Sequence, residues 1–249
     1  MQVVNDPRDT LVSIITVSYN SCKTIERTIK SVTGQTYRPL EYNIIDGGSG
    51  DGTVDIIKKY AREFDFIHYI SEPDNGIYDA MNKGIKKSSG EIIGIINSDD
   101  WYETDAAETV VRKYIENKKS PGVYYGAMGL YNKGAEKAIL FYNHAFLPER
   151  MINHPSCFVT RDIYERYGLF DLRYRIVADY ELMLRLYYKD SSLFYPIYDK
   201  MADFSEGSLS GSMASELETD VLLKEYGLLS NRKYVMRKAV RTIKKWLGY

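Results

Sequence analysis

The sequence has little of what several common classes of protein require. Only two of the 249 residues are cysteines, Cys22 and Cys157, and no C-x-x-C pair occurs, which argues against a disulfide scaffold and a structural zinc site. The 33 basic and 34 acidic side chains nearly cancel, so the overall charge does not indicate a nucleic-acid partner. No apolar run approaches the ~18 residues of a membrane-spanning helix, and residues 1–9 contain none of signal-peptide length. We expect a protein without transmembrane helices that works in a reducing compartment.

Two common nucleotide-binding signatures are also missing. The glycine-rich stretch at residues 47–52, GGSGDG, lacks the last glycine of the dinucleotide fingerprint, because Thr53 and Asp55 stand where it would fall. No Gly-Lys-Ser/Thr sequence of a phosphate-binding P-loop occurs. The stretch is instead expected to form a turn between a strand and a helix.

What the sequence does contain is an alternation of short apolar runs and helical patterns. The length and the 44% hydrophobic content allow one α/β domain with a sizeable core. Over the first hundred residues we expect strands at 11–19, 41–46, 66–70 and 92–96, and helices at about 20–32, 54–60 and 77–85. This alternation favours right-handed crossovers and a mostly parallel sheet with helices on both faces. The carboxyl ends of the strands then share one edge.

The pattern is less regular after residue 101. We expect helices at 106–117, 162–167 and 180–189, and strands at 123–131, 138–142 and 157–160. Residues 205–215 are rich in glycine and serine, which predicts a loop, and helices are expected over residues 216–249.

Polar residues follow the expected strands at the shared edge. Tyr19 and Asn20 end the first strand, Asp46 ends the second, and residues 97–100, Asn-Ser-Asp-Asp, end the fourth. Two adjacent carboxylates repel each other unless they point apart or a cation lies between them, so this pair indicates a hard divalent metal. Asp46 alone is equally explained as a cap of the glycine-rich turn.

Five segments, in this order along the chain, resemble family 2 glycosyltransferases. They are TVSYN (16–20), IDGGSGDGT (45–53), DNGIYDAMNKGI (74–85), GEIIGIINSDD (90–100) and VADYELMLRL (177–186). The resemblance covers about residues 11–210, is strongest to bacterial enzymes of capsule, O-antigen and exopolysaccharide synthesis, and implies the α/β GT-A fold. It implies a GT-A domain at 1–215, with a nucleotide-binding half at about 11–100 and an acceptor half at about 101–215, before a helical extension at 216–249.

The resemblance also implies roles for individual residues. The implied nucleotide-binding residues are Val17, Tyr19, Asn20, Asp46, Lys83, Asn97 and Ser98. The family's D-x-D element falls on residues 97–99, so that Asp99 would ligate Mg²⁺ or Mn²⁺. Asp179 would be the catalytic base of an inverting transfer. Weaker contacts to donor or acceptor are implied for Asp79, Asp100, His154 and Glu181.

Two positions depart from the family's pattern. Asn97 replaces the first acid of the D-x-D element, and an uncharged amide is expected to weaken metal binding without excluding catalysis. Met81 stands where many members carry arginine. Together with Ile77 and Ile85 it forms a stripe at helical spacing that we expect to face the core.

Two of the implied site residues also have a structural interpretation. Asp179 stands at the expected start of a helix, where an aspartate often caps the first turn, and capping is compatible with a role as the base. A lone histidine is more often structural, but the place of His154 before the base-bearing segment favours contact with the diphosphate or the acceptor.

The end of the chain has a basic amphipathic pattern. Its basic side chains are Arg232, Lys233, Arg237, Lys238, Arg241, Lys244 and Lys245, and apolar residues recur between them at helical spacing. Such a helix, within residues 231–249, can lie on an anionic membrane, where a lipid-linked acceptor would be met. Alternatively, its apolar stripe packs on the catalytic domain or on the second subunit of a homodimer.

We therefore expect a cytoplasmic glycosyltransferase at the inner face of the cell membrane. It would move a sugar from a UDP-sugar to a hydroxyl of a saccharide linked to a polyisoprenyl diphosphate, in cell-surface polysaccharide synthesis. A nucleotidyltransferase is an alternative, but TVSYN lacks the glycine and basic residues that it would need near the first strand. The other alternative, suggested by Asn97, is a protein that binds nucleotide sugars or saccharides and is impaired in catalysis.

Overall fold

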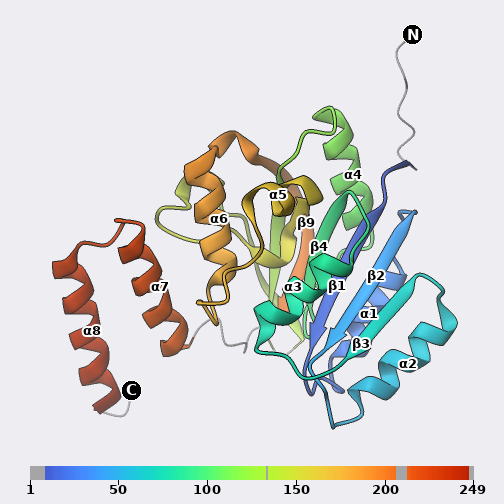
Figure 1. Ribbon diagram of the computed structural model, residues 1–249, viewed down its shortest axis with the longest axis horizontal. Coiled ribbons are helices and arrows are strands. Elements are labelled where there is room, and N and C mark those ends of the chain that lie inside the picture. The colour runs from blue at the N-terminus through green and yellow to red at the C-terminus, as the bar shows by residue number, and fades with distance from the viewer. Residues whose placement is uncertain (1–8, 133, 206–211, 247–249) are drawn as a thin grey trace.

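A computed structural model describes residues 9–132, 134–205 and 212–246, and within them a nine-stranded sheet forms the centre of the molecule (Figure 1). The strands lie in the order β3-β2-β1-β4-β8-β6-β9-β5, and β7 pairs with β6 outside this path. The strands are β1 Val12–Ser18, β2 Leu40–Asp46, β3 Ile67–Ser71, β4 Ile92–Asn97, β5 Trp101–Tyr102, β6 Val123–Asn132, β7 Ala135–Leu140, β8 Cys157–Thr160 and β9 Phe194–Ser205. The α-helices are α1 Ile25–Thr33, α2 Thr53–Glu63, α3 Ile77–Lys87, α4 Ala106–Glu116, α5 Arg161–Tyr167, α6 Ala178–Lys189, α7 Met213–Glu225 and α8 Asn231–Trp246.

The first half of the chain confirms the expected parallel sheet. Strands β3, β2, β1 and β4 pair in parallel, and the register joins Ser18 to Asp46 and Asp46 to Ser71. On the other side of β1, Val17 pairs with Asn97. Parallel pairing in this register brings the carboxyl ends of all four strands to one edge.

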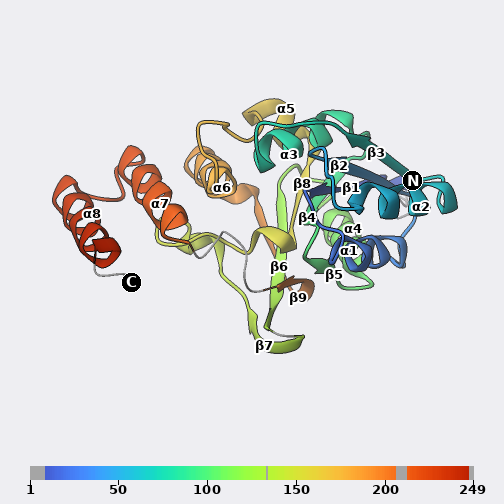
Figure 2. The ribbon, with the colours of Figure 1, turned by 90° about the horizontal axis from the view of Figure 1, so that it is seen from below.

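Alternate side chains of the central strands pack on opposite faces of the sheet. Ile14 of β1 lies in an apolar cluster with residues of α1, α2 and α4. Ile15 and Val17 lie in a second cluster with residues of α3, α5 and α6. Figure 2 shows α1 and α4 on one side of the sheet and α3 and α5 on the other. Successive apolar residues of one strand therefore point to opposite faces of the sheet and contribute to the apolar clusters on both sides.

Two expectations about the first hundred residues were wrong. The first helix begins at Ile25 and not at Asn20, because Asn20 has a left-handed backbone with φ of 49° and its side chain bonds the glycine-rich turn. Met81 and Ile85 face the core as expected, but Ile77 is 41% exposed. It lies at the first position of α3, before the helix meets the sheet.

The second half of the chain adds antiparallel strands that the sequence only partly predicted. β8 pairs antiparallel with both β4 and β6, and β9 pairs parallel with β6 through two register shifts. β9 escaped prediction because Pro196, Asp199 and Lys200 interrupt any apolar alternation. The two-residue strand β5 is too short to leave a pattern.

The end of the chain forms two helices that project from the sheet (Figures 1 and 2). The expected loop at 205–215 is partly replaced by structure, because β9 reaches Ser205 and α7 begins at Met213, whereas residues 206–211 lie outside the described residues. The expected domain boundary at residue 215 thus falls inside α7. In the described residues, no helix combines the length and the apolar character needed to cross a membrane.

Substitution of Gly84 by alanine should destabilise the fold. A Cβ at this position of α3 would lie 2.5 Å from Cγ2 of the buried Ile15 side chain. The helix would gain up to ~1 kcal/mol of intrinsic propensity. We expect the overlap to outweigh this gain, since overpacking of a core costs about 1–3 kcal/mol. Urea unfolding would measure the difference, with Gly50→Ala as the control because no atom lies within 4 Å of a Cβ there. An unchanged unfolding midpoint for Gly84→Ala would contradict the close α3–β1 packing.

Candidate functional site

The side chain of Asp46 is buried among hydroxyl and backbone donors at the end of β2. Its oxygens accept hydrogen bonds from Ser18 Oγ at 3.0 Å, Ser71 Oγ at 2.7 Å, and the backbone N–H and Oγ of Ser49 at 2.9 and 2.5 Å. Burial raises the pKa of Asp46, but these hydrogen bonds outweigh it and hold the pKa below its ordinary value. In this state Asp46 therefore organises the glycine loop, residues 47–52, and the interpretation of Asp46 as a cap describes its contacts well.

The end of β1 lies against the same glycine loop. Asn20 donates its backbone N–H to the loop at 2.8 Å and accepts a loop N–H on Oδ1 at 3.0 Å. The Oγ atoms of Ser21 and Ser98 lie 2.7 Å apart, which joins this segment to the end of β4. The Tyr19 ring is 66% exposed, whereas Val17 is buried. The fold thus brings the predicted residues of three strand ends together and leaves one aromatic ring open to solvent.

The end of β4 contains buried oxygen atoms without partners. Asp100 is fully buried; its Oδ1 accepts the backbone N–H of Ser205 at 3.0 Å, but its Oδ2 has no hydrogen-bond partner, and neither has Oδ1 of Asn97. Burial raises the pKa of Asp99, and burial together with the charge of Asp99 raises the pKa of Asp100 well above the ordinary value. Unpaired buried oxygens are costly, so this arrangement favours a cation.

Arg27 of α1 supplies part of the missing positive charge. Its Nη2 donates to the backbone oxygen of Asp99 at 2.6 Å, and its guanidinium lies 3.6 Å from the ring centre of Trp101. Its charge lowers the pKa values of both Asp99 and Asp100, although less than burial raises them. The sequence analysis missed this residue, because 72 positions separate it from Asp99 and no local pattern connects them.

The residues at the end of β4 fit a hard cation that is shared with a ligand. No group of three or more histidine, cysteine, aspartate or glutamate side chains that could hold a metal occurs among the described residues. Mg²⁺ commonly uses only one or two carboxylates and takes its other oxygens from phosphates and water. Asp99 and Asp100, with the free amide oxygen of Asn97, provide a donor set of that kind.

The predicted residues on α3 are already paired within the protein. Lys83 Nζ lies 3.1 Å from Glu72 Oε1 and 3.5 Å from Asp79 Oδ2. Asp79 Oδ2 also accepts the backbone N–H of Asn75 at 3.0 Å. In this state both side chains stabilise the turn that precedes α3, and a ligand would compete with these contacts.

Asp179 lies in the first turn of α6 but does not cap it. The N-cap is Val177, so the expectation that Asp179 caps the helix was wrong. Asp179 Oδ1 accepts the hydroxyl of Tyr78 on α3 at 2.8 Å and the backbone N–H of Tyr180 at 2.9 Å. Burial lowers the pKa of His154, while the charge of Asp179 raises it. The rings of His154 and Tyr78 both pack on Phe170, with ring centres 6.2 and 5.3 Å from that of Phe170. The fold thus brings Asp179, His154 and Tyr78 together.

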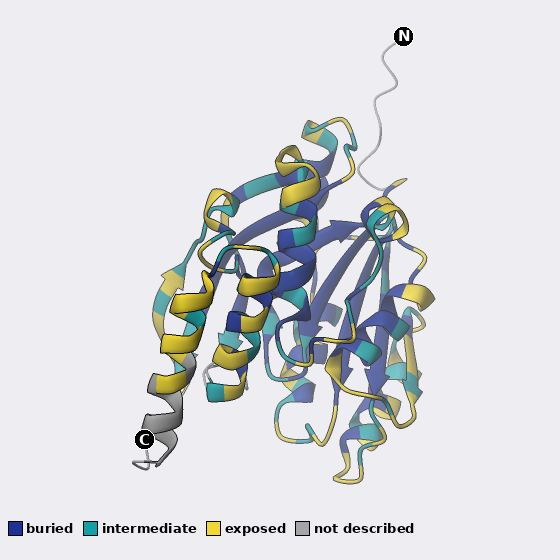
Figure 3. Cartoon of the chain, turned by 60° about the vertical axis from the view of Figure 1, so that its left-hand side comes forward, coloured by how far each residue is buried: buried dark blue, intermediate teal, exposed yellow. Residues whose placement is uncertain are grey.

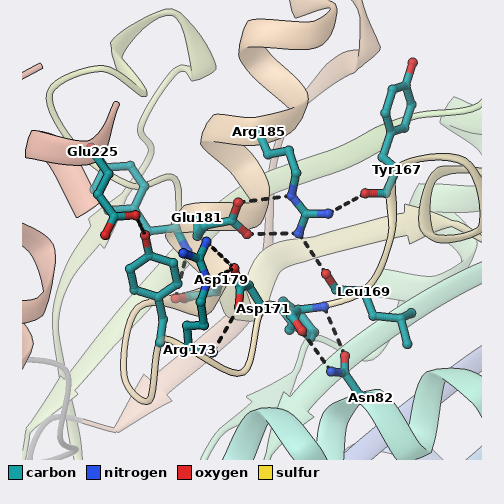
Figure 4. A network of polar contacts seen from close by, with 12 residues as sticks. Asn82, Tyr167, Leu169, Asp171, Arg173, Asp179, Glu181, Arg185 and Glu225 are labelled. Atoms are coloured by element: carbon teal, nitrogen blue, oxygen red, sulfur yellow. Dashed lines mark hydrogen bonds and ion pairs between the residues drawn. The ribbon is translucent and has the colours of Figure 1, made fainter. Parts of the chain in front are cut away.

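Glu181, two residues further along α6, points away from Asp179 into a separate network (Figure 4). Its two oxygens bond Arg185 Nε and Nη2 at 3.1 and 2.9 Å, and Oε1 also accepts the hydroxyl of Tyr226 at 2.9 Å. Arg185 in turn donates to the backbone oxygen of Leu169 at 2.7 Å. Glu181 is 5% exposed. Its contacts are those of a buried structural ion pair and not those of the donor or acceptor residue that the sequence suggested.

Sequence comparisons place this chain in a known family. The family model described as Glycosyl transferase family 2 matches residues 13–170. A Mycobacterium tuberculosis protein named as an uncharacterised glycosyltransferase is 35% identical over 182 residues, which are 70% of this chain and 68% of the relative. A PGL/p-HBAD biosynthesis glycosyltransferase of Mycobacterium bovis is 27% identical over 209 residues, or 82% of this chain and 80% of the relative.

Solved structures show the same fold at low sequence identity. Residues 1–349 of Staphylococcus aureus TarS, in complex with UDP-GlcNAc, match with a TM-score of 0.69 and 16% identity over 90% of this chain and 68% of that chain. A longer TarS structure also matches, and there the match covers 38% of the TarS chain. The Pyrobaculum calidifontis mannosyltransferase PcManGT, in complex with GDP-Man and Mn²⁺, matches with a TM-score of 0.58 and 19% identity, covering 96% of this chain and 67% of that one. The chain therefore has the GT-A fold and belongs to glycosyl transferase family 2.

Proposed function

We propose that this glycosyltransferase moves a sugar from a UDP-sugar to a hydroxyl group of a saccharide acceptor and inverts the configuration at the anomeric carbon. The observation that carries the proposal is the pair of unpartnered buried oxygens, on Asn97 and Asp100, at the edge where β1, β2 and β4 end. The UDP and UDP-GlcNAc complexes of TarS support a uridine donor.

The ends of β1 and β2 would hold the nucleotide. The exposed ring of Tyr19 offers a flat apolar face for the base. Asn20, bonded to the glycine loop, and Ser98, bonded to Ser21, add polar groups at the same edge. Asp46, held by five hydrogen-bond donors, would keep the glycine loop in place, and one of its oxygens would exchange a serine partner for the nucleoside.

Asp99 and Asp100 would hold Mg²⁺ or Mn²⁺, which offsets the negative charge that develops on the leaving diphosphate. The raised pKa values of both carboxyl groups would fall when the cation binds. Arg27 stabilises the backbone between them and remains in place in either state. Asn97 contributes an oxygen without charge, and we therefore expect weaker metal binding than a third acid would give.

Asp179 would act as the general base. An acceptor hydroxyl has a pKa far above neutrality, so it needs a carboxylate at about 3 Å to take its proton as its oxygen attacks. The new bond forms at the anomeric carbon while the bond to the diphosphate breaks, and the diphosphate leaves with the electron pair. Burial and the charge of Asp179 keep the pKa of Tyr78 well above its ordinary value, so Tyr78 stays protonated and orients the carboxylate.

Helices α7 and α8 would bring the enzyme to an anionic membrane that contains a polyisoprenyl-diphosphate-linked saccharide acceptor. Val235 and Met236 of α8 are 63% and 58% exposed, and Arg232 and Lys233 beside them are also exposed. Figure 3 shows the exposed surface of both helices on one side of the molecule. The pair is joined by an ion pair of 2.8 Å between Arg237 and Asp220. Apolar and basic groups presented together are typical of helices that lie in the interface of an anionic bilayer. Such a placement corresponds to the cytoplasmic face of the cell membrane.

Asp179→Asn should strongly lower the rate of transfer without loss of donor binding. The amide keeps the shape and the bond to Tyr78 but cannot accept the proton, and loss of a general base costs roughly 10²–10⁴-fold in kcat. Release of UDP from a panel of UDP-sugars would measure turnover, and calorimetry with UDP and Mn²⁺ would measure binding. Asp190→Asn, at the other end of α6, is the matched control. Binding of UDP by a wild type that turns over no donor would favour the alternative of a binding protein that is impaired in catalysis.

Asp100→Asn should raise the melting temperature of the metal-free protein at neutral pH. The folded-state pKa of Asp100 is raised, so its ionisation reduces stability progressively as the pH rises above the ordinary value and through the raised one. An amide removes this effect and keeps the acceptor for the backbone N–H of Ser205. Differential scanning fluorimetry would measure the melting temperatures of the wild type and of Asp100→Asn from acidic to neutral pH. The two melting temperatures should converge at low pH. Added Mn²⁺ should stabilise the wild type more than the variant; equal stabilisation would contradict a cation at Asp100.

Charge reversal on α8 should weaken membrane binding. Arg232→Glu with Lys233→Glu changes the charge by four units on the exposed surface, and each basic residue near an anionic bilayer contributes about 1 kcal/mol. Co-sedimentation with vesicles containing phosphatidylglycerol would measure the loss. Lys86→Glu with Lys87→Glu, an equal change on exposed positions of α3, is the control. The membrane proposal is overturned if both double variants sediment like the wild type. It is also overturned if light scattering shows that the wild type is a dimer and that charge reversal on α8 makes it a monomer.

A further inference from the structure

The start of α6 receives its cap from a helix that follows forty residues later in the chain. Glu218 of α7 accepts the backbone N–H of Arg175 on Oε1 at 2.8 Å, and those of Ile176 and Val177 on Oε2 at 2.6 and 2.9 Å. The separation along the chain is 41–43 positions. Val177 itself, as the N-cap, has no side-chain cap bond. A carboxylate with three N–H donors at the positive end of a helix is a strong, charge-assisted arrangement.

Glu218 and Asp179 bind different N–H groups at the start of α6. Glu218 accepts the N–H groups of the segment that leads into the helix, whereas Asp179 Oδ1 accepts the N–H of Tyr180 in the first turn at 2.9 Å. The same oxygen of Asp179 also accepts the Tyr78 hydroxyl. Glu218 therefore holds the backbone from which the Asp179 carboxylate reaches Tyr78.

The peptide groups of Ile176 join the two interactions. Its N–H donates to Glu218, and its carbonyl oxygen accepts the hydroxyl of Tyr78 at 2.7 Å. The same hydroxyl lies 2.8 Å from Asp179. Tyr78 has one proton for two acceptors. Its hydroxyl can donate this proton to Asp179 while Asp179 is ionised. Once Asp179 is protonated, Asp179 can donate to the hydroxyl oxygen of Tyr78, and Tyr78 can donate to the carbonyl oxygen of Ile176. A displaced Ile176 would disturb this shared hydrogen bond in both states.

Two further contacts tie α7 to the same segment. The hydroxyl of Tyr174 donates to Glu225 at 2.5 Å, and the hydroxyl of Tyr226, the C-cap of α7, donates to Glu181 at 2.9 Å. Figure 4 shows Glu225 and the base-bearing helix at close range. α7 thus contacts the loop before α6 and the first turn of α6 itself.

We propose that Glu218 is a positioning residue for Asp179, so that α7 belongs to the catalytic apparatus and is not only part of a C-terminal extension. The inference rests on the proposed role of Asp179 as the base. Glu218 does not touch the reacting atoms; it fixes the backbone from which Asp179 and its hydrogen bond to Tyr78 are presented.

The first test is kinetic. Glu218→Ala should lower kcat by about 100-fold, the effect expected of a ~1 Å misplacement of a reacting group, and should leave the Kd for UDP with Mn²⁺ unchanged. Glu218→Gln, which keeps an acceptor oxygen, should restore part of kcat. Glu225→Ala removes an equal charge from the same helix and one hydrogen bond to Tyr174, and serves as the control. Equal losses of kcat in Glu218→Ala and Glu225→Ala would overturn the proposal, because they would indicate a general effect of loosening α7.

The second test reads the position of Asp179 without any enzyme activity. The charge of Asp179 raises the pKa of His154, so displacement of the carboxylate should lower that pKa. The chain has three histidines, and NMR titration of their ring protons in Glu218→Ala should move His154 in the same direction as Asp179→Asn but less far. His68 and His144 should not move. An unchanged His154 in Glu218→Ala overturns the inference, whatever its activity. A shifted His154 together with full activity of Asp179→Asn would instead overturn the proposed base and leave the positioning contact intact.

Discussion

The parallel pairing of β2, β1 and β4 in one register is the constraint on which the rest of the site depends. Because Ser18 pairs with Asp46 and Val17 pairs with Asn97, three strands end at the same edge within one residue of each other. The chain must leave the sheet at each of these ends, and the residues that make the turns become the lining of the site. Substitutions that shift this register by one residue would turn every one of these side chains to the other face of the sheet.

The same edge shows two ways in which a buried carboxylate is accommodated. Asp46 receives donors from three segments, and these hydrogen bonds hold its pKa below the ordinary value. Burial and the neighbouring charge of Asp99 raise the pKa of Asp100, which accepts one backbone N–H and has one oxygen without a partner. The first arrangement is complete within the protein. The second leaves an oxygen without a partner, and the proposed cation would complete it.

The first turn of α6, which carries the proposed base Asp179, is held from two directions. Tyr78 on α3 contacts Asp179 from the side of the parallel sheet, and Glu218 on α7 holds the preceding turn from the side of the C-terminal helices. The matched family region ends at residue 170, before either Asp179 or Glu218. The segment that carries Asp179 and Glu218 therefore lies outside the matched family region, and α7 links it to the exposed helix α8 through Arg237 and Asp220.

The sequence by itself determined the parallel half of the sheet and the chemical character of its edge. Alternating and continuous apolar runs are local signals, so β1 to β4 and the acids at their ends could be predicted, as could the family and its GT-A fold. Only the tertiary structure decided which of these polar groups find partners. Arg27 meets Asp99 across 72 positions, Glu218 caps α6 across about forty, and Glu181 turns inward to Arg185 although its neighbour Asp179 does not. Such contacts depend on how separate segments pack, and no periodicity along the chain records them.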